Sequence, residues 1–202
     1  INLANYEQYM DYFKLIHEDM NKLEFRLDSK NRIYYPLFSA SIEHCISINF
    51  LKNQFMTVSM YALVRPALES YLRAMWVKYH LGELSMDDDL SKMHFPKRIE
   101  VLISEVDAAV PEFKEINFLQ ATFDALTPNM HDFTHGGIQS VARQYSGDTL
   151  TNIRDDEELE SILKFSVLVS SLAYSEIIQE NVGGESMQAN KISKAAERLL
   201  AL

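Results

Sequence analysis

The sequence predicts an all-α protein, a single-domain bundle of six to eight helices that spans residues 1–202. Apolar residues recur every three or four positions in several long segments, and no segment alternates with a period of two. The 202 residues include only 6 Gly and 5 Pro, fewer turn-forming residues than an all-β protein needs. A hydrophobic content of 47% with 24% charged residues is ordinary for a globular domain of this length.

The first part of the chain contains three predicted helices, over residues 2–27, 38–52 and 56–81. In the first, apolar side chains recur at three- and four-residue intervals, with charged side chains opposite. Ser39 is a candidate cap for the second. Pro66 falls inside the third, where an interior proline removes one backbone hydrogen bond and favours a kink. Gly82 is the expected C-terminal stop.

Four further helices are predicted, over residues 97–109, 112–126, 155–181 and 187–202. Pro96 and Pro111 precede two of them, as is common at helix starts. Asp155 and Glu158 form a capping pattern for the long helix that follows. Residues 127–137 are expected to form a short helix or a structured loop. No composition shift in the chain marks a domain boundary.

Charge and cysteine content limit the function classes and the compartment. A net charge of −10 disfavours a general nucleic-acid coat, because phosphate backbones are repelled. The single cysteine, Cys45, cannot form an internal disulfide and suits a reducing cytosol. Charge-free runs are shorter than the roughly 20 residues of a membrane span, and the first residues show no signal-peptide pattern. We therefore expect a cytoplasmic protein without a membrane partner.

The least expected feature is a set of polar side chains within the apolar helix predicted over residues 56–81. At about 100° per residue, these side chains share a face about 80° wide. We call them the polar stripe: Arg65, Glu69, Arg73, Trp76 and His80. Lys78 points to the opposite side. Charges that converge inside an apolar helix are costly unless they are paired or used, so the stripe marks a candidate site.

A second unusual segment, residues 117–142, carries no Lys or Arg and only two acidic residues. It contains His131 and His135, which share a face if the intervening residues are helical, with Asp132 and Thr134 beside them. Our hypothesis is that this segment faces the polar stripe. The two arginines would then approach Asp132, and the glutamate would accept a hydrogen bond from His131 or His135.

The pattern leaves three interpretations of this cluster open. It is a buried polar network that fixes helix register, an internal pocket for a small anion or nucleotide, or a partly exposed stripe without a function. The spacing of His131 and His135 also suits a metal ion. However, the sequence has no H-E-x-x-H motif and no cysteine cluster. We therefore predict no bound metal ion or cofactor.

Two resemblances concern the same residues. Arg73 and His80, with six residues between them, resemble the Arg-x(4–6)-His signature of HEPN ribonucleases, although Ala74 replaces the polar residue usual after the arginine. The stripe followed by the segment His131-Asp132-Phe133-Thr134-His135-Gly136-Gly137 is similar to an uncharacterised bacterial helical family, over about residues 61–143. Together these resemblances imply a HEPN-like all-helical fold.

The leading interpretation is a ligand-sensing or protein-interaction module with an internal polar pocket, which forms a homodimer. Small residues in the apolar segment 165–178, such as Ser166, Ser170 and Ala173, would allow close helix approach within a core or across an interface. The alternative is a metal-independent HEPN-type ribonuclease of a toxin–antitoxin or phage-defence system. There Arg73 would stabilise phosphate charge, and His80, His131 or His135 would transfer protons on RNA.

Overall fold

The computed structural model describes residues 3–96, 98–123, 145–146, 148–150, 156–182 and 187–201, and these residues confirm the all-α class. They form eight α-helices: α1 (Leu3–Met20), α2 (Asn31–Asn53), α3 (Thr57–Met75), α4 (Ile99–Ala109), α5 (Pro111–Lys114), α6 (Phe118–Phe123), α9 (Asp156–Val182) and α10 (Met187–Ala201). Shorter elements are the π-helix η1 (Trp76–His80), the 3-10 turn η2 (Leu90–Lys92) and the antiparallel strands β1 (Tyr145–Ser146) and β2 (Thr149–Leu150). The HEPN-like relationship stays a prediction.

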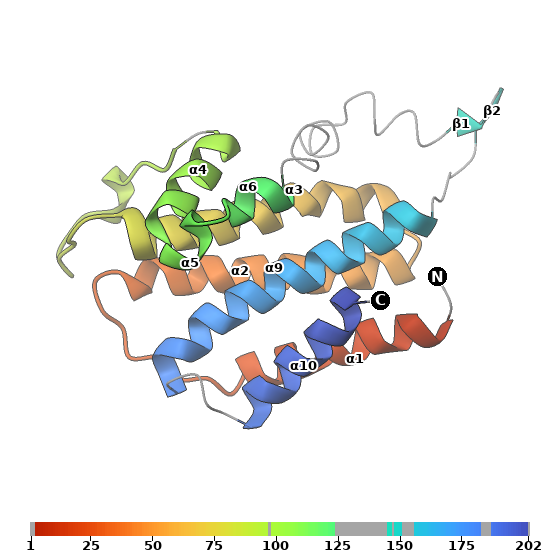
Figure 1. Ribbon diagram of the computed structural model, residues 1–202, viewed down its shortest axis with the longest axis horizontal. Helices are drawn as coiled ribbons and strands as arrows, with labels where there is room; N and C mark the ends of the chain where they lie inside the picture. Colours follow the sequence, from red (N-terminus) through yellow and green to blue (C-terminus); the bar gives the residue numbers. More distant parts are fainter. Residues whose placement is uncertain are drawn as a thin grey trace.

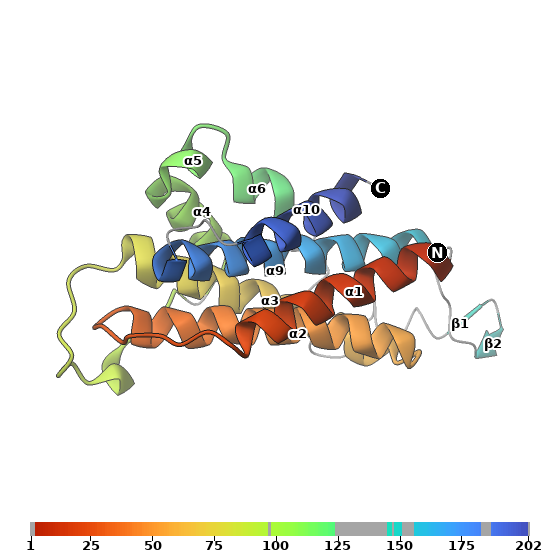
Figure 2. The ribbon, with the colours of Figure 1, turned by 90° about the horizontal axis from the view of Figure 1, so that it is seen from below.

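The bundle is built around the hairpin of α2 and α3, which pack against each other along their length (Figure 1). Helix α9 packs against this pair and also contacts α1 and α10. The short helices α4, α5 and α6 gather over the end of α3 that continues into η1, as Figures 1 and 2 show. The core therefore lies among α1, α2, α3 and α9, and α4 covers part of one face of α3.

Helix α9 uses its small residues inside the core of the chain. Ser166 and Ser170 are fully buried, and each hydroxyl donates to a carbonyl one turn earlier, at 2.8 and 2.6 Å. The Tyr12 hydroxyl approaches to 3.0 Å from that of Ser170. Of the two roles the sequence left open for these small residues, the structure shows close approach within the core.

Among the described helices, only α9 is long and apolar enough to cross a membrane, judged by length and composition alone. Of its most apolar window, 61% is buried inside the bundle. A helix that is apolar on all sides occurs both in protein cores and in membranes, so its composition alone does not distinguish the two.

The first predicted helix is too long, and the second begins too late. Helix α1 ends at Met20, and a turn at residues 21–22 leads into residues without regular secondary structure, where Phe25 packs on Tyr35 with ring centroids 4.5 Å apart. Helix α2 already starts at Asn31 because Asp28 and Asn31 cap each other: the Asp28 carboxylate accepts from the backbone N–H of Asn31 at 2.7 Å, and the Asn31 side chain accepts from that of Asp28 at 2.7 Å. Pro36 is accommodated inside α2.

The helix predicted over residues 112–126 is also interrupted. The described part divides into α5 and α6, with Asn117 between them at a φ of 47°. The buried Asp107 of α4 accepts from the first backbone N–H groups of α6, those of Leu119 and Gln120, both at 2.9 Å. A side chain from another helix therefore caps α6. Residues 127–137 lie outside the described residues.

Candidate anion-binding face on α3

Three charged residues of the polar stripe form a continuous ladder along α3. The Glu69 carboxylate accepts from Arg65 Nε through Oε1 at 2.7 Å and from Arg73 Nη2 through Oε2 at 3.1 Å. Both contacts join residues four positions apart, as expected for one helix face. The Glu69 side chain is only 17% exposed, and those of Arg65 and Arg73 are 22% and 35% exposed. The ladder is therefore a partly buried charge cluster that solvent can still reach.

The contacts of Arg73 fix its guanidinium group without using all its donors. Its central carbon lies 5.5 Å from the centroid of the Phe95 ring, a cation–π distance. Its Nε is buried and has no hydrogen-bond partner among the described residues. An unmatched buried donor costs about 1–3 kcal/mol, so native structures usually supply a partner.

The other end of the stripe is tied to α4 by Glu105. The Trp76 indole donates to Glu105 Oε2 at 2.6 Å, and His80 Nε2 lies 3.8 Å from the same oxygen. The Trp76 and His80 rings stack, with centroids 5.4 Å apart and an interplanar angle of 29°. The π-helical geometry of η1 places both rings there, and π-helical turns are frequent at functional sites. Sequence reasoning missed Glu105 because a contact across 29 residues leaves no local pattern.

The second half of the predicted site lies outside the described residues. These positions are His131, Asp132, Thr134 and His135. Their approach to the polar stripe stays a prediction. In the described part of the chain, no group of three or more His, Cys, Asp and Glu side chains is arranged to hold a metal ion.

Lys78 lies on the opposite side of the helix, as predicted, but it belongs to a network that the sequence did not reveal. Its ammonium group pairs with Glu176 Oε2 at 2.7 Å and with Glu180 Oε1 at 2.9 Å, both on α9. Tyr34 and Tyr35 donate to Glu180 at 2.5 and 2.9 Å. We call Lys78, Glu176 and Glu180 the lysine network.

Contacts within the lysine network shift the pKa values of Lys78 and Glu180 in the directions that favour ionisation. Burial lowers the pKa of Lys78, but hydrogen bonds to Glu176 and Glu180 outweigh burial and hold it above the ordinary 10.5. Burial likewise raises the pKa of Glu180, yet hydrogen bonds from Tyr34 and Lys78 hold it below 4.5. Burial together with the bond to Glu180 raises the pKa of Tyr35 to about 12. Lys78 and Glu180 therefore stay charged near neutral pH. The network joins η1 to α9, and Tyr34 and Tyr35 connect it to α2.

A comparison with protein-family models matches residues 38–199 to a family of unknown function, DUF6988. The chain belongs to this family. The DUF6988 match includes α3, η1 and α4, and therefore the whole polar stripe. Helix α1 lies outside the matched residues. Searches of curated proteins and of solved structures found no match. The prediction of an uncharacterised family is confirmed, while its motif and the HEPN relationship stay predictions.

Proposed function

We propose that this protein is a ligand-binding module that recognises a small anion, a carboxylate or phosphate group, at the polar stripe. The observation that carries the proposal is the division of one carboxylate, Glu69, between the guanidinium groups of Arg65 and Arg73. Two positive charges face one negative charge, so the ladder keeps a positive excess. That excess contrasts with the net charge of −10 of the whole chain.

The hydrogen-bonding capacity of the ladder also favours an anion. Each arginine gives one N–H to Glu69, and a guanidinium group has further N–H donors in a planar fork that matches carboxylate and phosphate. Glu69 and Phe95 hold the Arg73 guanidinium in place, which lowers the entropy that binding would cost.

The test is a calorimetric titration of the protein with inorganic phosphate and with citrate. We expect Arg73→Leu to weaken binding at least tenfold, because a hydrogen bond to a charged group contributes about 1.5–3 kcal/mol. Arg73→Lys keeps the charge but loses the fork, so we expect an intermediate affinity. Arg198→Leu, on the exposed face of α10, is the matched control and should bind as the wild type does.

Two results would contradict the proposal. One is a wild-type protein that binds neither anion. The other is an Arg73→Leu protein that binds as well as the wild type but unfolds at a lower temperature. This second result would identify the ladder as a structural network.

A second candidate function is the metal-independent ribonuclease of a toxin–antitoxin or phage-defence system. What favours it is the position of His80, which is 43% exposed and lies beside the Glu105 carboxylate. A carboxylate next to an imidazole can orient it for proton transfer. Incubation with RNA in the presence of a chelator tests this function: cleavage by the wild type but not by Arg73→Ala or His80→Ala would support it. Equal behaviour of all three proteins would exclude it.

A further inference from the structure

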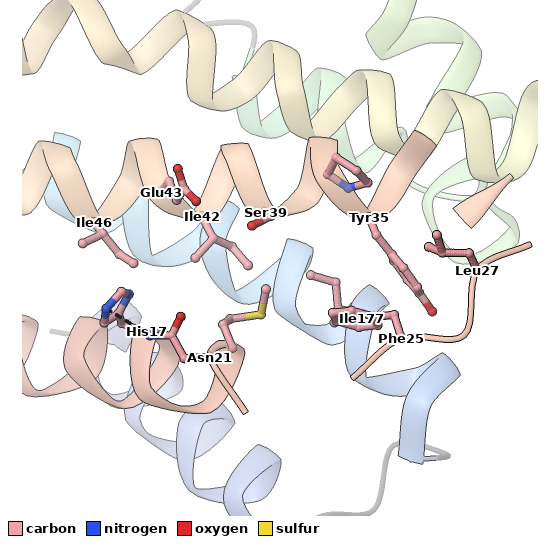
Figure 3. A pocket seen from close by; sticks show the side chains of 12 residues that line it. His17, Asn21, Phe25, Leu27, Tyr35, Ser39, Ile42, Glu43, Ile46 and Ile177 are labelled. Carbon is pink, nitrogen blue, oxygen red and sulfur yellow. Dashed lines mark hydrogen bonds between the residues drawn. The ribbon is translucent and has the colours of Figure 1, made fainter. Parts of the chain in front are cut away.

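A cavity of about 390 Å³ opens between α1 and α2, on elements that do not carry the polar stripe (Figure 3). Helix α1, the extended residues after it and α2 form its walls, and Ile177 of α9 contributes to its lining. Its volume falls within the roughly 300–1,000 Å³ typical of small-molecule sites.

The cavity has one polar end and one aromatic end. His17 and Asn21, from α1, and Glu43, from α2 on the other side of the cavity, lie toward the first, and Phe25 and Tyr35 lie at the second, as Figure 3 shows. The lining also includes four apolar side chains: Met20, Ile42, Ile46 and Ile177. This separation suits a molecule with an apolar body and one polar end group.

The walls of the cavity are held in place by contacts outside it. The Tyr35 hydroxyl donates to Glu180 at 2.9 Å, which fixes the ring from behind. Phe25 packs on that ring at a centroid distance of 4.5 Å. At the polar end, the side chains of Asn21 and His17 are hydrogen-bonded at 3.2 Å. A preformed site of this kind loses little conformational entropy when it binds a ligand.

The charge of the lining selects the polar end group of the ligand. Glu43 is the one Asp, Glu, Lys or Arg among the lining residues. In the described part of the chain, its carboxylate forms neither an ion pair nor a hydrogen bond. The rings of Phe25 and Tyr35 lie at the other end, where they offer an apolar surface to the body of the ligand. The carboxylate of Glu43 therefore favours a cationic end group over an anionic one.

We infer that the cavity binds a small organic cation, an ammonium group on an aryl or alkyl body. The ammonium group lies at the polar end beside Glu43, and the apolar body packs between the aliphatic side chains and the aromatic pair. This site is independent of the anion proposed for the polar stripe, and either can exist without the other.

The probe that tests the inference is 2-phenylethylammonium, with neutral 2-phenylethanol and anionic 3-phenylpropanoate as analogues of the same shape. Each is titrated into full-length protein with ¹³C-labelled Ile and Met methyl groups. We expect the cation to shift the methyl signals of Met20, Ile42, Ile46 and Ile177, and to bind at least fivefold more tightly than either analogue.

Separate variants test the contribution of the Glu43 charge and that of the cavity volume to cation binding. Glu43 is exposed, so Glu43→Gln should fold normally, and we expect it to weaken cation binding about fivefold, the effect of one partly solvated ion pair. Glu112→Gln, an exposed glutamate of α5, is the matched control and should bind as the wild type does. Ser39→Phe fills the cavity and should abolish binding, with circular dichroism to verify its fold.

Three results would overturn the inference: no binding of the cation to the wild type, equal binding of the anionic analogue, or unchanged affinity in Glu43→Gln. Methyl shifts confined to residues outside the cavity would overturn it as well.

Discussion

Replacement of Lys78 by Met should destabilise the fold far more than the loss of an ordinary surface charge. Lys78 and Glu176 are only 12% and 14% exposed, and Glu180 is 31% exposed. Removing one partner of a fully buried pair costs about 3–5 kcal/mol. Since these side chains retain some solvent contact, we expect Lys78→Met to lower the free energy of unfolding by about 2–4 kcal/mol.

The assay is urea denaturation followed by circular dichroism at pH 7. For a chain of this size, the expected loss corresponds to a midpoint about 1 M lower in urea, with an unchanged m-value. The control is Lys164→Met, which breaks the Lys164–Glu160 pair within α9, where the side chains are 31% and 34% exposed. That pair should contribute less than about 1 kcal/mol. Equal destabilisation by the two variants would refute the claim that the lysine network stabilises the fold more than a more exposed ion pair does.

The pH dependence gives a second, independent check. Because the folded-state pKa of Glu180 lies below 4.5, its contribution is present above that pH and is lost as the pH falls through the folded pKa. The raised pKa of Lys78 acts in the opposite sense, so its contribution is present below 10.5 and is lost at higher pH. The difference between the wild type and Lys78→Met should therefore be largest between about pH 5 and 10. A difference that persists unchanged at pH 3 would contradict this explanation.

Three further predictions concern other parts of the fold. Asp107→Ala should lower the free energy of unfolding by about 2–4 kcal/mol, measured in urea, because the buried N–H of Leu119 and the partly buried N–H of Gln120 lose their acceptor; a loss under about 0.5 kcal/mol would contradict the capping role. Trp76→Phe removes the hydrogen bond to Glu105 and should cost about 1.5–3 kcal/mol in the same assay, whereas an unchanged midpoint would show that the bond contributes nothing. The homodimer stays a prediction, for which light scattering should give twice the mass of the chain. Phe50 and Met56, at the turn between α2 and α3, are 57% and 50% exposed. If this turn forms the interface, the double variant Phe50→Ser and Met56→Ser should give the mass of the monomer.

The sequence predicted best the helices whose signals are local. For α9, predicted over residues 155–181, the structure gives Asp156–Val182, because the acidic start and the following glycines mark both ends. The predicted end of α1 was wrong because Leu23 and Phe25 continue the apolar pattern although the chain has already left the helix. The break between α5 and α6 depends on Asp107, a residue of another helix, and no local pattern encodes it.

In the candidate site, too, contacts along one helix could be predicted from the sequence, whereas contacts between helices could not. The shared face of Arg65, Glu69 and Arg73 follows from spacing along one helix, and their contacts confirm it. The partners of Trp76 and Lys78 come from α4 and α9, and many surface glutamates of similar appearance occur in the sequence. Only the packing of the helices selects Glu105, Glu176 and Glu180 from among them.

The two polar faces of the helix formed by α3 and η1 provide an internal comparison. On one face, the single charge of Lys78 meets two carboxylates, and its ammonium group also lies 3.4 Å from the Glu176 carbonyl oxygen, so its donors are matched. On the other face, two guanidinium groups meet the single carboxylate of Glu69, and the buried Nε of Arg73 has no acceptor within the part of the chain that the structure describes. Both faces are packed by the same fold and both need their charges compensated to be stable. The fold thus surrounds the single cation of Lys78 with two carboxylates, whereas the ladder of Arg65, Glu69 and Arg73 has two cations for one carboxylate. The positive excess of the ladder is what an anionic ligand would neutralise.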